Sequence, residues 1–152
     1  MFAAGQATAI DYADNTQTIG VTSVSTSSAW LRGAQQKLKE LSKLETGWDG
    51  YNSRPIQPEA LETAADLLRD ASKFGLSEPQ IFPVPGGGLQ FEWDNAKHEM
   101  ELGILPNGDI EFLITDADGE MLERRMSPSW SGEVYRLAIW FKNQQAAIND
   151  FC

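Results

Sequence analysis

Carboxylates are the most concentrated chemical groups of this chain, and they gather between Gly88 and Glu123. This stretch holds ten acidic residues and one lysine, Lys97, whereas the whole 152-residue chain has 22 acids. Carboxylates hold divalent cations, transfer protons, or bind the basic groups of a partner protein. The ten are Glu92, Asp94, Glu99, Glu101, Asp109, Glu111, Asp116, Asp118, Glu120 and Glu123.

The spacing of these acids places several of them on one face of a predicted sheet. Apolar and polar residues alternate along 89–94, 99–104 and 110–114, which is typical of half-buried antiparallel strands. We align the apolar faces of the first two segments through Trp93 and Met100. This register predicts two pairs of facing acids and a fifth acid on the next strand: Glu92 with Glu101, Asp94 with Glu99, and Glu111.

Like charges directly opposite each other in a sheet destabilise it by about 0.2 to 1 kcal/mol per pair, so folding alone does not favour this arrangement. Three interpretations of the acidic face stay open. It is a solvated face that keeps the protein soluble, a recognition face whose carboxylates imitate phosphates for a basic protein, or a site for Mg²⁺ or Ca²⁺. The third has no known metal-binding loop spacing in its favour.

The segment LPNGDI predicts the hairpin that joins the second and third of these strands. A two-residue loop would pair apolar residues with polar ones all along the hairpin. A three-residue loop of Pro106, Asn107 and Gly108 instead pairs Leu105 with Asp109 and keeps the apolar faces together. Proline then starts a type I turn, and Gly108 takes the left-handed bulge position.

Helical patterns flank the strands. We expect one helix from an N-cap at Ser27 or Ser28 to about Leu44, a second from Pro58 to Phe74, and a third from about Trp130 to Ala147. The predicted fold is α+β, an antiparallel meander of about four or five strands with helices packed on one face, in the order α-α-β-β-β-β-α. Residues 1–28 are predicted to be a flexible Ser/Thr-rich arm, and 29–152 a single domain.

The corner LETGWDGYNSRPI between the first two helices is the other candidate site. Gly47 suits a left-handed helix end, Trp48 is expected to turn back into the core, and Asp49-Gly50 is a strong turn dipeptide. This structural interpretation explains most of the residue types. The functional alternative is an exposed partner-binding patch, because aromatic residues and arginine anchor interfaces. Its members are Trp48, Asp49, Tyr51 and Arg54.

The single histidine, the net charge and the single cysteine argue against several classes of function. His98, the only histidine, is expected to be exposed in a turn, and no nucleophile, cofactor or His-based metal motif accompanies it. The net charge of −10 argues against direct binding of nucleic acid. A single cysteine, Cys152, and the lack of a signal sequence or membrane span favour the cytoplasm. We therefore predict no enzyme activity and no cofactor.

Three motifs carry a resemblance to a known family. The segments GWDGYNSRPI, PQIFPVPGGGLQFEW and ILPNGDIEF occur in this order. Together they resemble a family of small uncharacterised bacterial and phage proteins with a Gly-Trp-Asp-Gly-Tyr corner, a Gly-Gly-x-x-x-Glu-Trp strand and a Pro-x-Gly hairpin. The resemblance covers about residues 40 to 115. It implies a bacterial or phage origin and a shared fold. It implies no biochemical activity and no functional residue.

These observations favour a small acidic module that binds a basic protein or complex, for example one that handles nucleic acids, and inhibits or scaffolds it. Antitoxins, immunity proteins and inhibitors of host defence are proteins of this type, and the assignment to them is an analogy. The first alternative is a carboxylate-based domain or enzyme that binds a divalent metal. The second is a structural subunit of a larger assembly in which the N-terminal arm becomes ordered on contact. The sequence predicts no oligomeric state.

Overall fold

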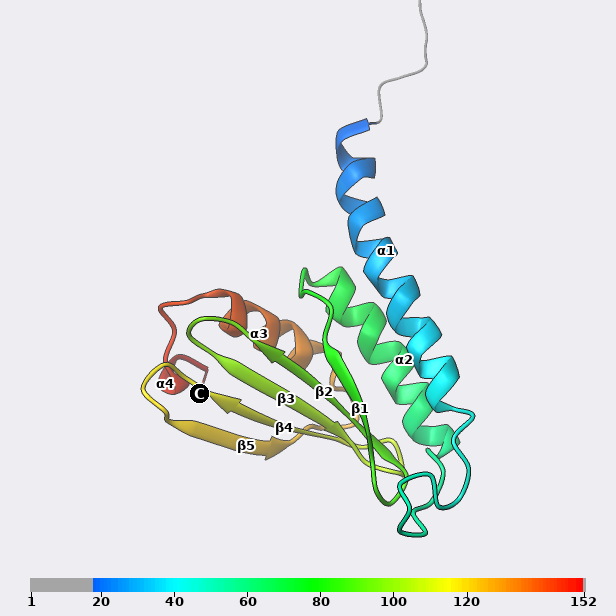
Figure 1. Cartoon of the computed structure of the whole chain (residues 1–152). Coiled ribbons are helices and arrows are strands. Elements are labelled where there is room, and N and C mark those ends of the chain that lie inside the picture. Colours follow the sequence, from blue (N-terminus) through cyan, green and yellow to red (C-terminus); the bar gives the residue numbers. More distant parts are fainter. Residues whose placement is uncertain (1–17, 152) are drawn as a thin grey trace, which may run out of the picture.

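The computed structural model describes residues 18–151, with side chains described from residue 29 onward. Within this range, helices precede and follow a five-stranded antiparallel sheet, so the predicted α+β meander is confirmed (Figure 1). The elements in chain order are α1 (Thr18–Leu41), α2 (Pro58–Lys73), β1 (Gln80–Val84), β2 (Gly88–Asp94), β3 (Glu99–Ile104), β4 (Ile110–Thr115), β5 (Met121–Arg125), α3 (Ser131–Lys142) and α4 (Ile148–Phe151).

One face of the sheet forms the hydrophobic core with the helices. The strands follow one another in space in their sequence order, β1 to β5, and every neighbouring pair is antiparallel. Helix α2 packs on β2 and β3, and α1 and α3 pack against α2 (Figure 1). Alternate residues of the three central strands are buried beneath these helices: Leu89, Phe91, Trp93, Met100, Leu102, Ile104, Ile110, Phe112 and Ile114.

The hairpin between β3 and β4 has the predicted three-residue loop. The N–H of Leu105 donates to the carbonyl of Asp109 at 2.8 Å, and the N–H of Gly108 donates to the carbonyl of Leu105 at 2.8 Å. Gly108 has a φ of +93°, as the bulge position requires. The hydroxyl of Thr63 in α2 donates to the carbonyl of Gly108 at 2.9 Å, so the hairpin tip is attached to the helix layer.

The first helix begins earlier than predicted. Ser27 and Ser28 lie inside α1, so neither is the N-cap. Serine and threonine cost less than about 1 kcal/mol each in a helix, so a helix already formed against α2 extends through them. Residues 1–17 of the predicted arm lie outside the described residues. Although α1 has 24 residues, no helix among the described residues is apolar and long enough to cross a membrane.

The single helix predicted near the C-terminus is divided in two. Helix α3 ends at Lys142, residues 143–147 turn, and α4 begins at Ile148. Two tertiary contacts hold this turn. The carbonyl of Ala146 contacts Nε2 of His98 at 2.8 Å, and the N–H of Ile148 donates to the carboxylate of Asp116 at 3.0 Å. These contacts replace the hydrogen bonds that a continuous helix would have made.

His98 is buried, with 1% of its surface exposed, so the expected exposed imidazole was wrong. The carboxamide oxygen of Asn95 accepts the N–H groups of Lys97 and His98, and this turn directs the ring inward. There Nδ1 lies 3.2 Å from the carbonyl of Phe141, and the ring packs against Trp140 with centroids 4.1 Å apart. His98 therefore joins the β2–β3 turn to the end of α3.

Candidate functional site

The face of the sheet turned away from the helices carries most of the candidate site residues, and we call it the open face. Its residues alternate with the buried ones along each strand, and none of them belongs to the hydrophobic core. From β2 to β5 the open face consists of Gln90, Glu92, Asp94, Glu99, Glu101, Gly103, Glu111, Leu113, Thr115, Met121, Glu123 and Arg125.

The two predicted pairs of facing acids are present. In the register between β2 and β3, Glu92 lies opposite Glu101 and Asp94 lies opposite Glu99. We call these four residues the acidic quartet. Across the next pair of strands Glu101 lies opposite Leu113, so the quartet ends there. Like charges therefore face each other twice within one pair of strands, where each pairing destabilises the sheet.

The charges of the acidic quartet are not neutralised within the described part of the chain. Ion pairs there involve the carboxylates of Asp66, Asp109 and Glu111, and none involves the quartet. Partial burial, followed by the charges of Glu92 and Glu99, raises the pKa of Glu101 above its usual range. The Glu92 carboxylate does accept a hydrogen bond from the amide of Gln90 at 2.6 Å. The quartet thus concentrates negative charge without an ion pair among the described residues.

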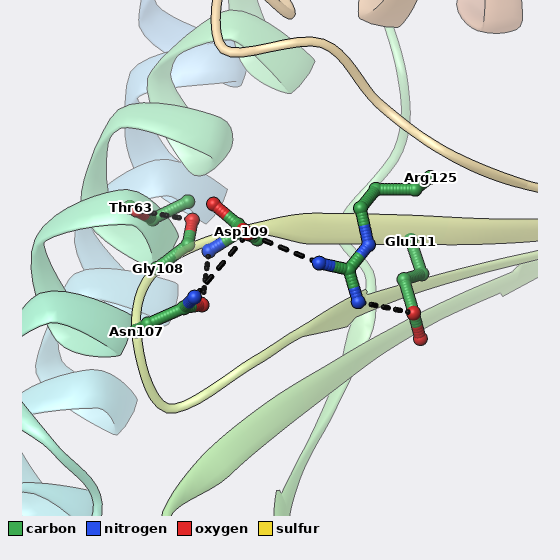
Figure 2. Close-up of polar contacts among 6 residues, drawn as sticks. All are labelled: Thr63, Asn107, Gly108, Asp109, Glu111 and Arg125. Atoms are coloured by element: carbon green, nitrogen blue, oxygen red, sulfur yellow. Dashed lines mark hydrogen bonds and ion pairs between the residues drawn. The ribbon is translucent and has the colours of Figure 1, made fainter.

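Glu111 is in a different electrostatic environment from the quartet. Figure 2 shows the guanidinium of Arg125 between two carboxylates, 3.2 Å from Asp109 and 3.0 Å from Glu111. The amide of Asn107 also donates to Asp109 at 3.2 Å. Because about half of each paired side chain is exposed, these ion pairs contribute little to stability, about 0 to 1 kcal/mol each. They nevertheless balance the charge of Glu111, which the sequence analysis had grouped with the other four acids.

A shallow hollow of about 140 Å³ lies beside the quartet. It forms where Gly103 has no side chain and only the carbonyl of Glu111 comes within 4 Å of where a Cβ would stand. Gly103 and Leu113 supply an apolar lining, and Glu101, Glu111 and Glu123 supply carboxylates. The alternating pattern of the strands does not predict this hollow. A glycine at an outward position of an otherwise alternating strand was the available signal.

The corner between α1 and α2 is held by its own hydrogen bonds. The Asp49 carboxylate accepts the hydroxyl of Ser53 and the N–H groups of Tyr51 and Ser53, and the Ser53 hydroxyl is the main reason that the pKa of Asp49 is lowered. The indole of Trp48 donates to the carbonyl of Arg54 at 2.9 Å. Trp48 is only half-buried and lies outside the hydrophobic core, so the expected core anchor was wrong.

The corner does not complete a site with the acidic quartet. The N–H of Gln57 donates to the carbonyl of Gly87 at 3.0 Å, which places the corner beside the β1–β2 turn. Asp94 and Glu99 lie at the other end of β2 and β3, about 20 Å away at the usual rise of a strand. Tyr51, with 87% of its surface exposed, and the exposed Arg54 remain a separate candidate contact. The structure thus divides the nine predicted site residues into two groups.

The candidate site gains no support from a metal-binding group or from a known relative. Among the described residues, no group of three or more His, Cys, Asp or Glu side chains is arranged to hold a metal ion. No family model, curated protein or solved structure matches the chain. The motifs of the corner, strand and hairpin therefore remain a resemblance.

Proposed function

We propose that this protein is an interaction module that binds a basic protein through its open face and inhibits or scaffolds that protein. The observation that carries the proposal is the acidic quartet, in which Glu92 faces Glu101 and Asp94 faces Glu99 without a neutralising cation among the described residues. Since opposed carboxylates destabilise the sheet, a partner that supplies positive charge accounts for them better than folding does.

The chemistry of the open face indicates which groups of a partner it accommodates. An arginine or lysine has an apolar stem and a cationic head. The stem fits the hollow over Gly103 and Leu113, and the head meets the carboxylates of Glu101 and Glu123. Proteins that handle nucleic acids present such side chains in rows, because they follow regularly spaced phosphates. Antitoxins, immunity proteins and inhibitors of host defence are modules of this type, and that comparison is an analogy.

Two charge-matched variants test the proposal. The face variant carries Glu92→Lys and Glu101→Lys. The control variant carries Glu40→Lys and Glu120→Lys at exposed positions outside the open face. Each reversal raises the net charge by 2, so both variants change from −10 to −6. Immobilised wild-type protein and both variants are exposed to a lysate of the producing organism, and captured proteins are identified by mass spectrometry.

We expect one or more basic proteins to bind the wild type and the control variant, and to be lost from the face variant. With a purified partner, calorimetry should show at least about tenfold weaker binding for the face variant and a smaller salt dependence. Equal affinity of all three proteins for that partner would contradict the proposal. No observation on the described residues favours the metal-binding or structural-subunit alternatives over this one.

A further inference from the structure

Strand β5 forms an edge of the sheet whose outer backbone groups have no strand partner among the described residues (Figure 1). Two hydrogen bonds to β4 frame it, from the N–H of Met126 to the carbonyl of Ile110 and from the N–H of Asp116 to the carbonyl of Glu120. Backbone groups alternate in direction along an antiparallel strand, so every second residue of β5 directs its N–H and carbonyl outward. These residues are Met121, Glu123 and Arg125.

The opposite edge of the sheet has two kinds of protection that β5 lacks. Pro83 lies in β1 and has no N–H to donate, and α1 packs beside that strand. Both features are common devices against pairing with another chain. Strand β5 contains no proline, and its exposed Met121 adds apolar surface at the edge. The chain thus presents one strand edge that can accept another strand.

Charge restricts how β5 can pair with β5 of a second copy. A two-fold axis at Glu123 would place this residue opposite itself, and an axis at Arg124 would do the same with two arginines. Opposed like charges destabilise both arrangements. The second also requires Arg125 to pair with Glu123, although Arg125 already contacts Asp109 and Glu111. An axis at Leu122 has neither defect.

We infer that β5 pairs antiparallel with β5 of a second copy about a two-fold axis at Leu122, which joins the two five-stranded sheets into one of ten strands. Leu122 is partly buried on the core side and lies opposite Ile114, so the axis brings two apolar side chains together. The outward groups of Met121 and Glu123 then form about four backbone hydrogen bonds with the second copy. The two open faces become continuous.

This inference does not depend on the proposed function, and salt distinguishes the two. Each copy carries a net charge of −10, so the copies repel each other at long range. Salt screens that repulsion, and self-association through β5 therefore strengthens as salt is added. Binding of a basic protein to the open face weakens under the same change. Because the strand is short, we expect a weak dimer that forms at high protein concentration.

Cysteine cross-linking tests the register. On a Cys152→Ser background, Leu122→Cys is compared with Glu123→Cys and Arg124→Cys, each the centre of one candidate two-fold axis. Directly opposed residues of a non-hydrogen-bonded pair have Cα atoms about 4.5 Å apart, within reach of a disulfide. We expect Leu122→Cys to form dimers fastest under mild oxidation. Faster cross-linking of either other variant overturns the register, and an absence of dimers from all three overturns the inference.

A proline substitution tests the pairing itself. Glu123→Pro removes an outward N–H and leaves the bonds between β5 and β4 in place, as Pro83 does in β1. Glu123→Ala is the matched control, because it removes the same side chain and keeps the N–H. In sedimentation equilibrium at high salt, we expect the alanine variant to dimerise like the wild type and the proline variant at least about tenfold more weakly. A monomeric wild type, or equal dimerisation of both variants, overturns the inference.

Discussion

Replacing Glu101 with glutamine keeps the shape of the side chain and removes its charge from the acidic quartet. Glu101 lies opposite Glu92, and its pKa is raised first by partial burial and then by Glu92 and Glu99. The variant should therefore be more stable than the wild type at neutral pH. Relief of one opposed pair is worth about 0.2 to 1 kcal/mol. For a chain of this size, the upper end corresponds to a rise of about 2 to 4 °C in melting temperature.

The pH dependence of this difference has a definite sign. Because the pKa of Glu101 is raised in the folded protein, protonation of this carboxyl favours the folded state. That contribution is fully present below the unfolded pKa, near pH 4, and is lost as the pH rises through the folded pKa. Glutamine does not titrate. The advantage of Glu101→Gln should therefore be largest at neutral pH and should vanish in acid.

Urea unfolding at neutral and acidic pH measures both effects. Glu111→Gln is the matched control, because its carboxylate pairs with Arg125 and its removal should be neutral or destabilising by up to about 1 kcal/mol. A double-mutant cycle of Glu92→Gln with Glu101→Gln isolates the repulsion between the two. The reasoning fails if Glu101→Gln is less stable than the wild type at neutral pH, or if its advantage is the same at both pH values.

Three other substitutions test the contacts that hold the fold. His98→Phe keeps a ring but loses both carbonyl contacts, and chemical unfolding should show a loss of about 1 to 3 kcal/mol; an unchanged midpoint would contradict this. Gly108→Ala places an alanine at a φ of +93° with its Cβ 2.9 Å from Thr63 Oγ1, so thermal unfolding should reveal a loss above about 1 kcal/mol. Gly119→Ala shares the strain of a positive φ, +84°, but has open space around its Cβ, so its loss should be smaller, and equal losses would contradict the steric contribution at Gly108. The N–H of Ile148 is the main cause of the lowered pKa of Asp116, so stability should fall as the pH drops through that pKa. Asp116→Asn should remove this acid sensitivity from stability curves, and retention of it would refute the assignment.

The strand register was predictable because two local constraints agree. The loop of Pro106, Asn107 and Gly108 sets which residues of β3 and β4 face each other, and the alternation of apolar residues sets which side is buried. A shift by one residue would move the whole apolar set of a strand to the open face. The alternation of apolar residues by itself predicts the position of Glu92 opposite Glu101, which the structure has.

The features that sequence reasoning missed depend on contacts between distant residues. His98 is directed inward by the turn at Asn95, but its partners lie more than 40 residues away in α3 and the following loop. Those contacts also interrupt the predicted C-terminal helix, although its apolar pattern is continuous. Trp48 bonds to a carbonyl within its own corner, and Ile56 is buried in its place. Periodicity gives no information about such partners.

The distribution of charge on the open face supports our proposal that this face binds a partner. The chain places Arg125 where it balances Asp109 and Glu111, so the fold does contain the means to compensate carboxylates on this face. The acidic quartet receives no such cation from the described residues. A partner that supplies the missing cations would relieve the repulsion and lower the pKa of Glu101. Because binding would lower the pKa of Glu101, it should release protons as the pH falls towards the raised pKa of the free protein, and almost none near neutral pH. A partner bound away from Glu101 would release no protons from this carboxyl.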